Sequence, residues 1–225
     1  MAQIKAEYVD HCGNDLTTVN AARVSFGKES EWERGEDGTH YLSYKDAKLI
    51  KYLAEHKHFS PFGHAFASFR VKAPIFVARQ LVKHQYLRWN EISRRYVDDE
   101  PEFYMPEVWR GRSADKKQGS YTPEEQPIEW LGVNAGTHEF YMEAYNRYKW
   151  MLDIGIAPEQ ARMVLPQSTM TEWYWSGSLD ALADMCKLRC KEDTQYETRL
   201  VADQVSVKMK QLFPVSWMAL VGEQT

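Results

Sequence analysis

The sequence predicts an α+β fold in a single domain over residues 1–225, with a mixed or antiparallel sheet flanked by helices. Two observations lead to this class. Segments in which apolar and polar residues alternate are interleaved irregularly with segments whose apolar residues recur at helical spacing. The chain has 225 residues, of which 44% are hydrophobic and 27% are charged, so it is long enough to bury one core.

The first half of the chain contains two predicted strands and three predicted helices. The alternation of Ala65, Ala67, Phe69 and Val71 with other side chains predicts a strand, and Pro74 suits the first turn of the helix that follows. In chain order we expect a strand at 5–10, a helix at 17–24 capped by Asp15 or Thr17, a loop at 29–39, a helix at 43–56, a strand at 64–72 and a helix at 75–82.

The second half contains one predicted strand between helices. Phe140, Ala144, Tyr148 and Met151 have the spacing of one helix face, and the threonines and aromatic residues up to Trp175 favour a strand. In chain order we expect a surface loop at 111–132, a helix at 136–152, a short helix at 158–165, a strand at 168–175, and helices at 178–188 and 194–212.

A cluster of cations and amides lies between Arg79 and Asp99, in a chain whose net charge is −4. Fixed positive charges and forked donors of this kind suit a small anion, above all a phosphate ester. The cluster begins on a helix and is expected to continue into a loop or extended segment. Its polar members are Arg79, Gln80, Lys83, His84, Gln85, Arg88, Asn90, Glu91, Ser93, Arg94 and Arg95.

The same cluster has a second interpretation, because charges on a helix commonly form a solvated face. That interpretation suits Arg79 best. It is weaker for Glu91, Ser93 and Arg95, which alternate in sequence and would point to one side of an extended segment. From the pattern alone, both interpretations remain open.

Two arginines outside the cluster are further candidates for anion binding. Arg162 lies on the short helix before Pro166, where it also has the spacing for a weak surface ion pair with Glu159. Arg189 closes a predicted helix, a position at which a cation also complements the helix dipole.

Composition argues against several classes of protein. The acidic net charge disfavours extended nucleic-acid binding, and no apolar stretch approaches the roughly 20 residues of a membrane span. His58, His64 and His84 are scattered and the three cysteines lack ligand spacing, so no metal is expected. Basic neighbours flank Cys190, but an unreactive thiol is the simpler interpretation. With no signal pattern at the start, we expect a cytoplasmic protein without disulfides.

Several short motifs follow one another between Ala21 and Arg199. They are residues 21–26 (Ala-Ala-Arg-Val-Ser-Phe), His58-x-Ser60-Pro-Phe, Lys83-His84-Gln85 with Ser93 after seven residues, Ala161-Arg162-x-Val-Leu-Pro166, the strand sequence 171–175, and Leu188-Arg189 with Gln195-x-Glu197. In this order they resemble the flavin-dependent thymidylate synthase family, whose signature is Arg-His-Arg, seven residues and Ser. Asn90-Glu91, Arg95 and Tyr96 are in register with the extended signature.

The resemblance implies a reductive methylation of dUMP to dTMP. In that reaction 5,10-methylenetetrahydrofolate provides the carbon for C5 of uracil, reduced FAD provides the hydride, and NADPH reduces the flavin again. The resemblance also implies the family's fold, no cysteine nucleophile, and a homotetramer in which several subunits build each active site.

The resemblance further implies roles for individual residues. Arg189 is the implied catalytic residue, because a guanidinium beside the uracil favours its ionised form electrostatically. The implied dUMP site comprises Gln80, Leu81, Val82, Lys83, Glu91, Ile92, Ser93, Arg94, Arg95, Arg162 and Arg189. The implied FAD site comprises Ser60, Lys83, His84, Gln85, Glu91, Ser178, Leu179, Asp180 and Asp184.

The chain departs from the family pattern at four of these positions. Lys83 and Gln85 stand in place of two arginines, so the forked donors and one positive charge are lost. Asp180 and Asp184 stand where some members have arginine and asparagine.

Because of these departures, we consider which residue could replace the missing positive charge, and two alternative functions. Arg88 or Arg79 is a candidate to restore the missing cation. The first rival is a paralogue that binds flavin and nucleotide without catalysis. The second is an RNA-binding module in which bases stack on Tyr86, Trp89 and Tyr96.

Overall fold

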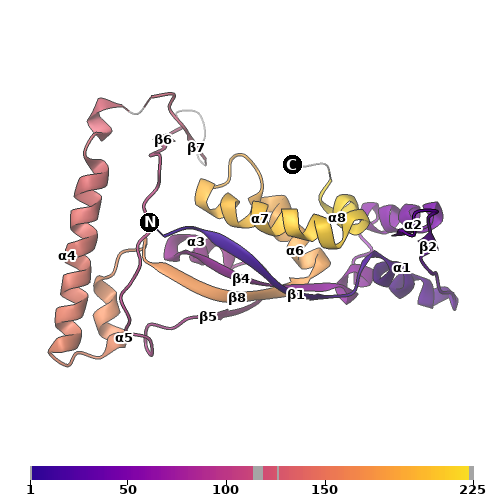
Figure 1. Ribbon diagram of the computed structural model, residues 1–225, viewed down its shortest axis with the longest axis horizontal. Helices are drawn as coiled ribbons and strands as arrows, with labels where there is room; N and C mark the ends of the chain where they lie inside the picture. Colours follow the sequence, from indigo (N-terminus) through magenta and orange to yellow (C-terminus); the bar gives the residue numbers. More distant parts are fainter. Residues whose placement is uncertain (1, 114–118, 126, 223–225) are drawn as a thin grey trace.

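The computed structural model describes residues 2–113, 119–125 and 127–222. Strands and helices alternate irregularly along the chain, as predicted (Figure 1). The elements are β1 Lys5–Cys12, α1 Asp15–Arg23, η1 Val24–Phe26, β2 Glu33–Arg34, β3 His40–Tyr41, α2 Tyr44–Glu55, η2 Ser60–His64, β4 Phe66–Pro74, α3 Ile75–Leu81, β5 Arg88–Glu91, β6 Gly111–Arg112, β7 Ser120–Tyr121, η3 Ile128–Trp130, α4 Val133–Asp153, α5 Pro158–Ala161, η4 Arg162–Val164, β8 Met170–Ser178, α6 Leu179–Arg189, α7 Tyr196–Leu212 and α8 Pro214–Val221.

The central sheet has four strands in the order β1-β4-β8-β5, and every neighbouring pair is antiparallel. This confirms the α+β class. The sheet is antiparallel rather than mixed because each pair of neighbours runs in opposite directions, even where long helical segments separate them in sequence.

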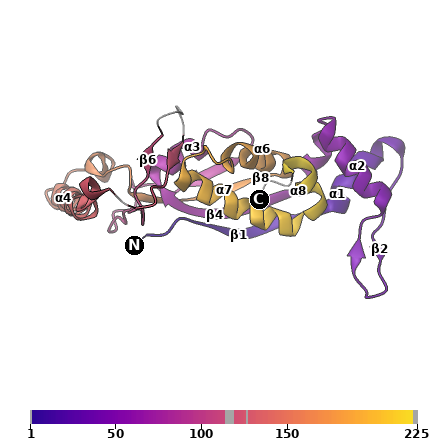
Figure 2. The same ribbon diagram turned by 90° about the horizontal axis from the view of Figure 1, so that it is seen from above.

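One face of the sheet carries the core. The alternation predicted for β4 is confirmed, since Phe69 and Val71 are fully buried. Opposite them in register lie Trp175 and Trp173 of β8, and Trp89 of β5 stacks on Trp173 with ring centroids 4.3 Å apart. Helices α6, α7 and α8 cover this face, with α7 against β1 and β4 and α6 against β8 (Figures 1 and 2). This helical layer brings the start of α7 close to α3.

Helix α4 stands at one end of the molecule, away from the sheet, while α1 and α2 lie at the other end (Figures 1 and 2). The prediction that Phe140 lies on the inner face of α4 is wrong, since this residue is half exposed. Tyr141 takes the inner place because its ring stacks on Phe103 at 4.9 Å and its hydroxyl donates to the carbonyl of Tyr104 over 2.8 Å. Tyr148, two helical turns later, is buried as predicted.

Helix α1 begins two residues earlier than predicted, and its cap is neither Asp15 nor Thr17. Asn14 is the cap, with its side-chain oxygen accepting the backbone N–H of Thr17 over 3.1 Å. The Thr17 hydroxyl accepts in turn from the backbone N–H of Asn14 over 3.0 Å, so the two residues form a capping box.

Helix α8 is an element that the sequence patterns did not predict. It begins with Pro214 in its first turn, a position suited to proline. The Asp15 carboxylate accepts the backbone N–H groups of Val215 at 2.9 Å and Ser216 at 2.8 Å. These N–H groups have no partner within the helix, so Asp15 caps α8 and joins the two ends of the chain.

Two segments predicted as loops contain short paired strands. The loop at 29–39 begins a small hairpin made by β2 and β3, and the loop at 111–132 contains the pair β6 and β7 followed by η3. Residues 114–118 and 126 of the second loop lie outside the described residues. In the part of the chain that the structure describes, no helix is both long and apolar enough to cross a membrane.

Candidate functional site

Helix α3 carries the first half of the cationic cluster to the edge of the core. Leu81 is fully buried and holds the helix, while Arg79 and Lys83 are exposed. Immediately after Lys83-His84-Gln85, Tyr86 has a φ of 64°, a left-handed conformation that is uncommon outside glycine. The chain reverses there and enters β5, so of the two predicted forms near Asn90, a loop or an extended segment, the extended one is found.

Glu91, at the end of β5, is held firmly by its neighbours. One carboxylate oxygen accepts from the hydroxyl of Thr171 at 2.6 Å, and the other accepts from the indole N–H of Trp89 at 3.1 Å. The carboxylate is therefore fixed beside the sheet.

The prediction that Glu91, Ser93 and Arg95 share one face of an extended segment is wrong. The strand ends at Glu91, and the chain turns at Ser93. The carbonyl of Ser93 accepts the N–H of Tyr96 at 2.9 Å, while its hydroxyl accepts the N–H of Arg95 at 3.3 Å. A serine hydroxyl that bonds nearby backbone competes with strand pairing, which explains the turn.

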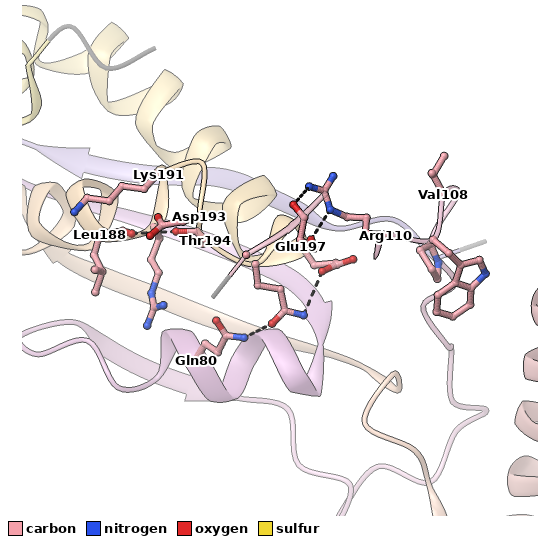
Figure 3. A pocket seen from close by; sticks show the side chains of 14 residues that line it. Gln80, Val108, Arg110, Leu188, Lys191, Asp193, Thr194 and Glu197 are labelled. Atoms are coloured by element: carbon pink, nitrogen blue, oxygen red, sulfur yellow. Dashed lines mark hydrogen bonds between the residues drawn. The ribbon is translucent and has the colours of Figure 1, made fainter. Parts of the chain in front are cut away.

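A cavity of about 600 Å³ lies where α3, the end of α6 and the start of α7 meet (Figure 3). It contains two residues predicted to bind the nucleotide, Gln80 of α3 and Arg189 of α6. The lining residues are Gln80, Pro106, Val108, Trp109, Arg110, Gly119, Ser120, Leu188, Arg189, Lys191, Asp193, Thr194, Gln195 and Glu197. The sequence therefore identified two binding residues of this cavity, and its motifs also included the lining residues Leu188, Gln195 and Glu197 without assigning them a role.

Arg189 and His84, predicted for different ligands, are in contact at this cavity. The Nε of Arg189 donates to Nε2 of His84 at 3.0 Å. Burial, together with the Arg189 charge, lowers the pKa of His84 to about 4, so the imidazole is neutral and accepts this bond. In the part of the chain described, the terminal amino groups of Arg189 have no hydrogen-bond partner. They remain available to a ligand.

Because the pKa of His84 is lowered in the folded protein, we expect the protein to lose stability in acid. The unfolded chain takes up a proton near the ordinary histidine pKa of 6.5, but the folded chain does so only near pH 4. The free energy of unfolding therefore falls as the pH drops from 6.5 to 4, by about 1–2 kcal/mol once solvent screening is included. Urea unfolding at pH 7 and pH 4.5 should show this loss in the wild type relative to His84→Gln, which keeps an acceptor but does not titrate. Equal losses in the two proteins would contradict the assignment.

The remaining predicted nucleotide residues do not line this cavity. The side chain of Leu81 lies in the core, so only its backbone is available, whereas Val82 and Ile92 are exposed. The Nη1 atom of Arg94 lies 3.6 Å from Oδ1 of Asp99, so the two side chains form an ion pair. The other predicted nucleotide residues that do not line the cavity are Lys83, Glu91, Ser93, Arg95 and Arg162.

Arg162 makes a different contact from the one its spacing suggests. It is exposed on η4, and its Nε donates to the backbone carbonyl of Glu159 at 3.2 Å rather than to the carboxylate. The guanidinium is thus held at a helix end.

Five of the predicted flavin residues, Ser60, Ser178, Leu179, Asp180 and Asp184, lie on η2 or on and just before α6. Ser60 lies on η2, which packs against α6, and Ser178 precedes the first turn of that helix. Leu179 is fully buried, so it offers only backbone. Asp180 has a buried carboxylate oxygen without a hydrogen-bond partner, and Asp184 pairs with Lys187 at 3.2 Å.

No cysteine in the described part of the chain lines the cavity. Cys186 is fully buried, and burial raises the pKa of its thiol well above the ordinary value. Cys190 is half-buried near Asp203, and burial raises the pKa of the Asp203 carboxyl. Cys186 therefore serves as a packing group whose thiol donates to the carbonyl of Ala202 at 3.6 Å, and Cys190 packs against the core.

Comparison with known proteins identifies the family. Residues 7–215 match the family described as thymidylate synthase complementing protein, Thy1. The chain belongs to this family.

Members of the family match the chain over most of its length. It is 39% identical to the flavin-dependent thymidylate synthase of Thermus thermophilus over 213 residues, which is 94% of this chain and 73% of that protein. It is 38% identical to the flavin-dependent thymidylate synthase of Kosmotoga olearia over 214 residues, 95% of this chain and 88% of that protein.

Solved structures confirm the fold. The UMP/dUMP methylase PolB from Streptomyces cacaoi bound with 5-Br dUMP has a TM-score of 0.81 at 33% identity, covering 97% of this chain and 94% of that chain. PolB bound with 5-Br UMP has a TM-score of 0.83 at 30% identity, with the same coverage.

The sequence patterns missed most of the cavity wall. Arg110 is an example, since its guanidinium donates to the hydroxyl and carbonyl of Ser120 and lies over the ring of Tyr196 at 5.1 Å. It comes from a polar segment with no periodicity. Gln195 and Glu197 were noted only as part of the resemblance, and their spacing at the start of a helix gave no chemical signal.

Proposed function

We propose that this protein is a flavin-dependent thymidylate synthase, which converts dUMP to dTMP with 5,10-methylenetetrahydrofolate as carbon donor and NADPH as reductant. The observation that carries the proposal is the pairing of Arg189 with neutral His84 at the cavity that also contains Gln80. A half-buried guanidinium with free terminal donors suits an electron-rich pyrimidine. Family membership supplies the reaction class.

The residues near α6 and after α3 fit FAD by the chemistry of their side chains. Lys83, Gln85, Ser60 and Ser178 supply a positive charge, an amide and two hydroxyls, and in the described ranges none of these side-chain groups has a hydrogen-bond partner. Such donors suit a pyrophosphate. The unpartnered buried oxygen of Asp180 is an acceptor that suits a ribose hydroxyl or a ring N–H. When bound and reduced, FAD supplies the hydride that converts the transferred methylene to a methyl group.

The chain's own residues bind and orient the nucleotide. The terminal amino groups of Arg189 lie at the cavity, where they stabilise negative charge as it develops on the uracil ring before C5 forms its bond to the carbon donor. His84 holds Nε of the guanidinium, so the charge is positioned before the nucleotide arrives. In the proposed reaction, formation of the C5–carbon bond breaks a bond from that carbon to a folate nitrogen, and loss of the C5 proton to solvent then restores the ring.

We propose that the site is completed by further copies of this chain. The exposed cations Lys83 and Arg95 and the half-exposed Ser93 are expected phosphate and sugar ligands, yet they lie outside the cavity that contains Arg189. A homotetramer, as the family resemblance implies, brings such residues from one subunit to the Arg189 of another. Sedimentation of the purified protein tests this directly.

The proposal is tested first by colour and by NADPH turnover. The purified protein should be yellow, and dUMP should accelerate its oxidation of NADPH. A yellow protein whose NADPH oxidation ignores dUMP would favour the non-catalytic paralogue. A colourless protein that binds RNA in a salt-sensitive way would favour an RNA-binding module, which uses stacking on exposed Tyr86 and Tyr96.

The same assay tests whether the protein prefers a deoxyribonucleotide or a ribonucleotide as substrate. Because PolB is described with 5-Br UMP as well as 5-Br dUMP, UMP serves as the alternative substrate. We propose dUMP as the preferred one, on the basis of the thymidylate synthases among the relatives.

Arg88 is expected to contribute to flavin binding. It lies exposed on β5 shortly after Lys83-His84-Gln85, and it has no ion pair within the described residues. One charge-assisted hydrogen bond to phosphate contributes about 1.5–3 kcal/mol, so Arg88→Ala should weaken FAD binding at least roughly tenfold. Arg34→Ala, an exposed arginine on β2, is the matched control. Unchanged FAD affinity in Arg88→Ala, measured by flavin fluorescence, would refute this role.

A further inference from the structure

A chain of hydrogen bonds runs along the wall of the cavity that contains Gln80 (Figure 3). The hydroxyl of Thr198 lies 3.2 Å from Oε1 of Gln80, and Nε2 of Gln80 contacts Oε1 of Gln195. Nε2 of Gln195 lies 3.2 Å from Oε2 of Glu197. The side chain of Tyr104 lies beside the same carboxylate, and burial, together with the charge of that carboxylate, raises the pKa of the Tyr104 hydroxyl. The chain thus begins at a fully buried threonine and ends at a half-buried tyrosine.

The direction of this chain follows from one residue. An ionised carboxylate only accepts hydrogen bonds, whereas an amide and a hydroxyl can each donate or accept. Glu197 therefore requires Gln195 to present its NH₂ group, which leaves the Gln195 carbonyl facing Gln80. Gln80 must then present its own NH₂ group to Gln195, so its carbonyl faces the hydroxyl of Thr198.

Tyr104 cannot reverse this direction. Burial and the neighbouring charge of Glu197 raise the pKa of Tyr104 well above its ordinary value, so its hydroxyl stays protonated and donates. Both ends of the chain therefore supply donors, and the carboxylate of Glu197 alone decides which way the two amides point.

We propose that Glu197, acting through Gln195, is a positioning residue that fixes the orientation of the Gln80 amide for nucleotide recognition. The inference rests on the proposed function, in which Gln80 contacts the nucleotide. After its two internal bonds, Gln80 retains one N–H donor and one carbonyl lone pair in a fixed order. This fixed N–H donor and carbonyl acceptor can bind a nucleotide edge that has an acceptor beside a donor. If the Gln80 amide were reversed, donor would face donor and acceptor would face acceptor.

The substitution Glu197→Gln tests this at nearly constant shape. The carboxamide can donate as well as accept, so the two amides are free to flip, and we expect the Kd for dUMP and the KM to rise about tenfold. Flavin content and kcat should change much less, because Gln80 is not among the expected flavin ligands. Glu192→Gln is the matched control, since it removes the same charge from an exposed position near the cavity.

A double variant separates positioning from simple damage. In Gln195→Glu with Glu197→Gln, the acceptor-only group moves next to Gln80 and again forces the NH₂ group of Gln80 toward position 195. The new amide at position 197 then donates to the relocated carboxylate and accepts from Tyr104, so every bond is satisfied and the net charge equals that of the wild type. We expect this double variant to recover most of the dUMP affinity lost in the single one.

Calorimetric titration of flavin-loaded protein with dUMP decides between the outcomes. Weaker binding in Glu197→Gln with recovery in the double variant is the expected result. Wild-type affinity in Glu197→Gln, or no recovery in the double variant, would overturn the inference. If the wild type itself fails to bind dUMP, the proposed function fails instead, so the two failures are distinguishable.

Discussion

Replacement of Arg189 by alanine should lower turnover of dUMP about 10²–10³-fold, the effect of removing one preorganised electrostatic group from an active site. Arg189 is half-buried, and burial lowers its pKa, so its charge acts in surroundings where water screens poorly. Flavin content should stay close to wild type, because the expected flavin donors on η2, on α6 and after α3 remain. Single-turnover formation of dTMP measures the effect.

Two further variants serve as controls for the Arg189→Ala result. Arg189→Lys keeps a charge but has no Nε to contact His84, so its activity should lie between wild type and alanine. Arg147→Ala, on the distant helix α4, should behave as wild type. Turnover in Arg189→Ala within threefold of wild type would remove Arg189 from the catalytic role.

The variant Trp217→Ala should lower the free energy of unfolding by about 3–5 kcal/mol, the usual cost of deleting a large aromatic side chain from a core. Trp217 is 2% exposed, and its indole N–H donates to the hydroxyl of Ser206 on α7 at 3.1 Å. Its loss leaves a cavity and an unpaired hydroxyl where α8 packs against α7.

Trp150→Ala is the matched control for this effect. The Trp150 side chain is half exposed on α4, so its removal should change the free energy of unfolding by less than about 1 kcal/mol. Guanidinium denaturation of both variants checks the difference. Similar losses in the two would mean that α8 is not part of the cooperative core.

The sequence predicted those parts of the fold whose signals are local. The alternation in β4 required nothing beyond neighbouring residues and is confirmed. The start of α2 was likewise predicted from local signals to within one residue, since the helix begins at Tyr44 with Ser43 as its cap. Helix α8 was missed because its apolar run is short and its capping carboxylate, Asp15, comes from the opposite end of the chain. Phe140 was misplaced because contacts with another segment decide the inner face of α4, as the ring of Tyr141 shows.

The residues of the candidate site likewise fall into those that sequence motifs identified and those that depend on tertiary contacts. Gln80 and Arg189 were identified from their motifs, and the structure places both at one cavity. Arg110 was missed because it comes from an irregular segment whose position depends on tertiary contacts. The turn at Ser93 was missed because period-two spacing cannot reveal a serine hydroxyl that bonds backbone nearby.

The most direct test of the proposed reaction is release of tritium from dUMP labelled at C5. Methyl transfer requires that the C5–H bond breaks, so flavin-loaded protein with NADPH and 5,10-methylenetetrahydrofolate should release tritium in step with dTMP formation. Arg189→Ala should lose both together. Absence of tritium release from a flavin-loaded wild-type protein that binds dUMP would contradict the proposed function.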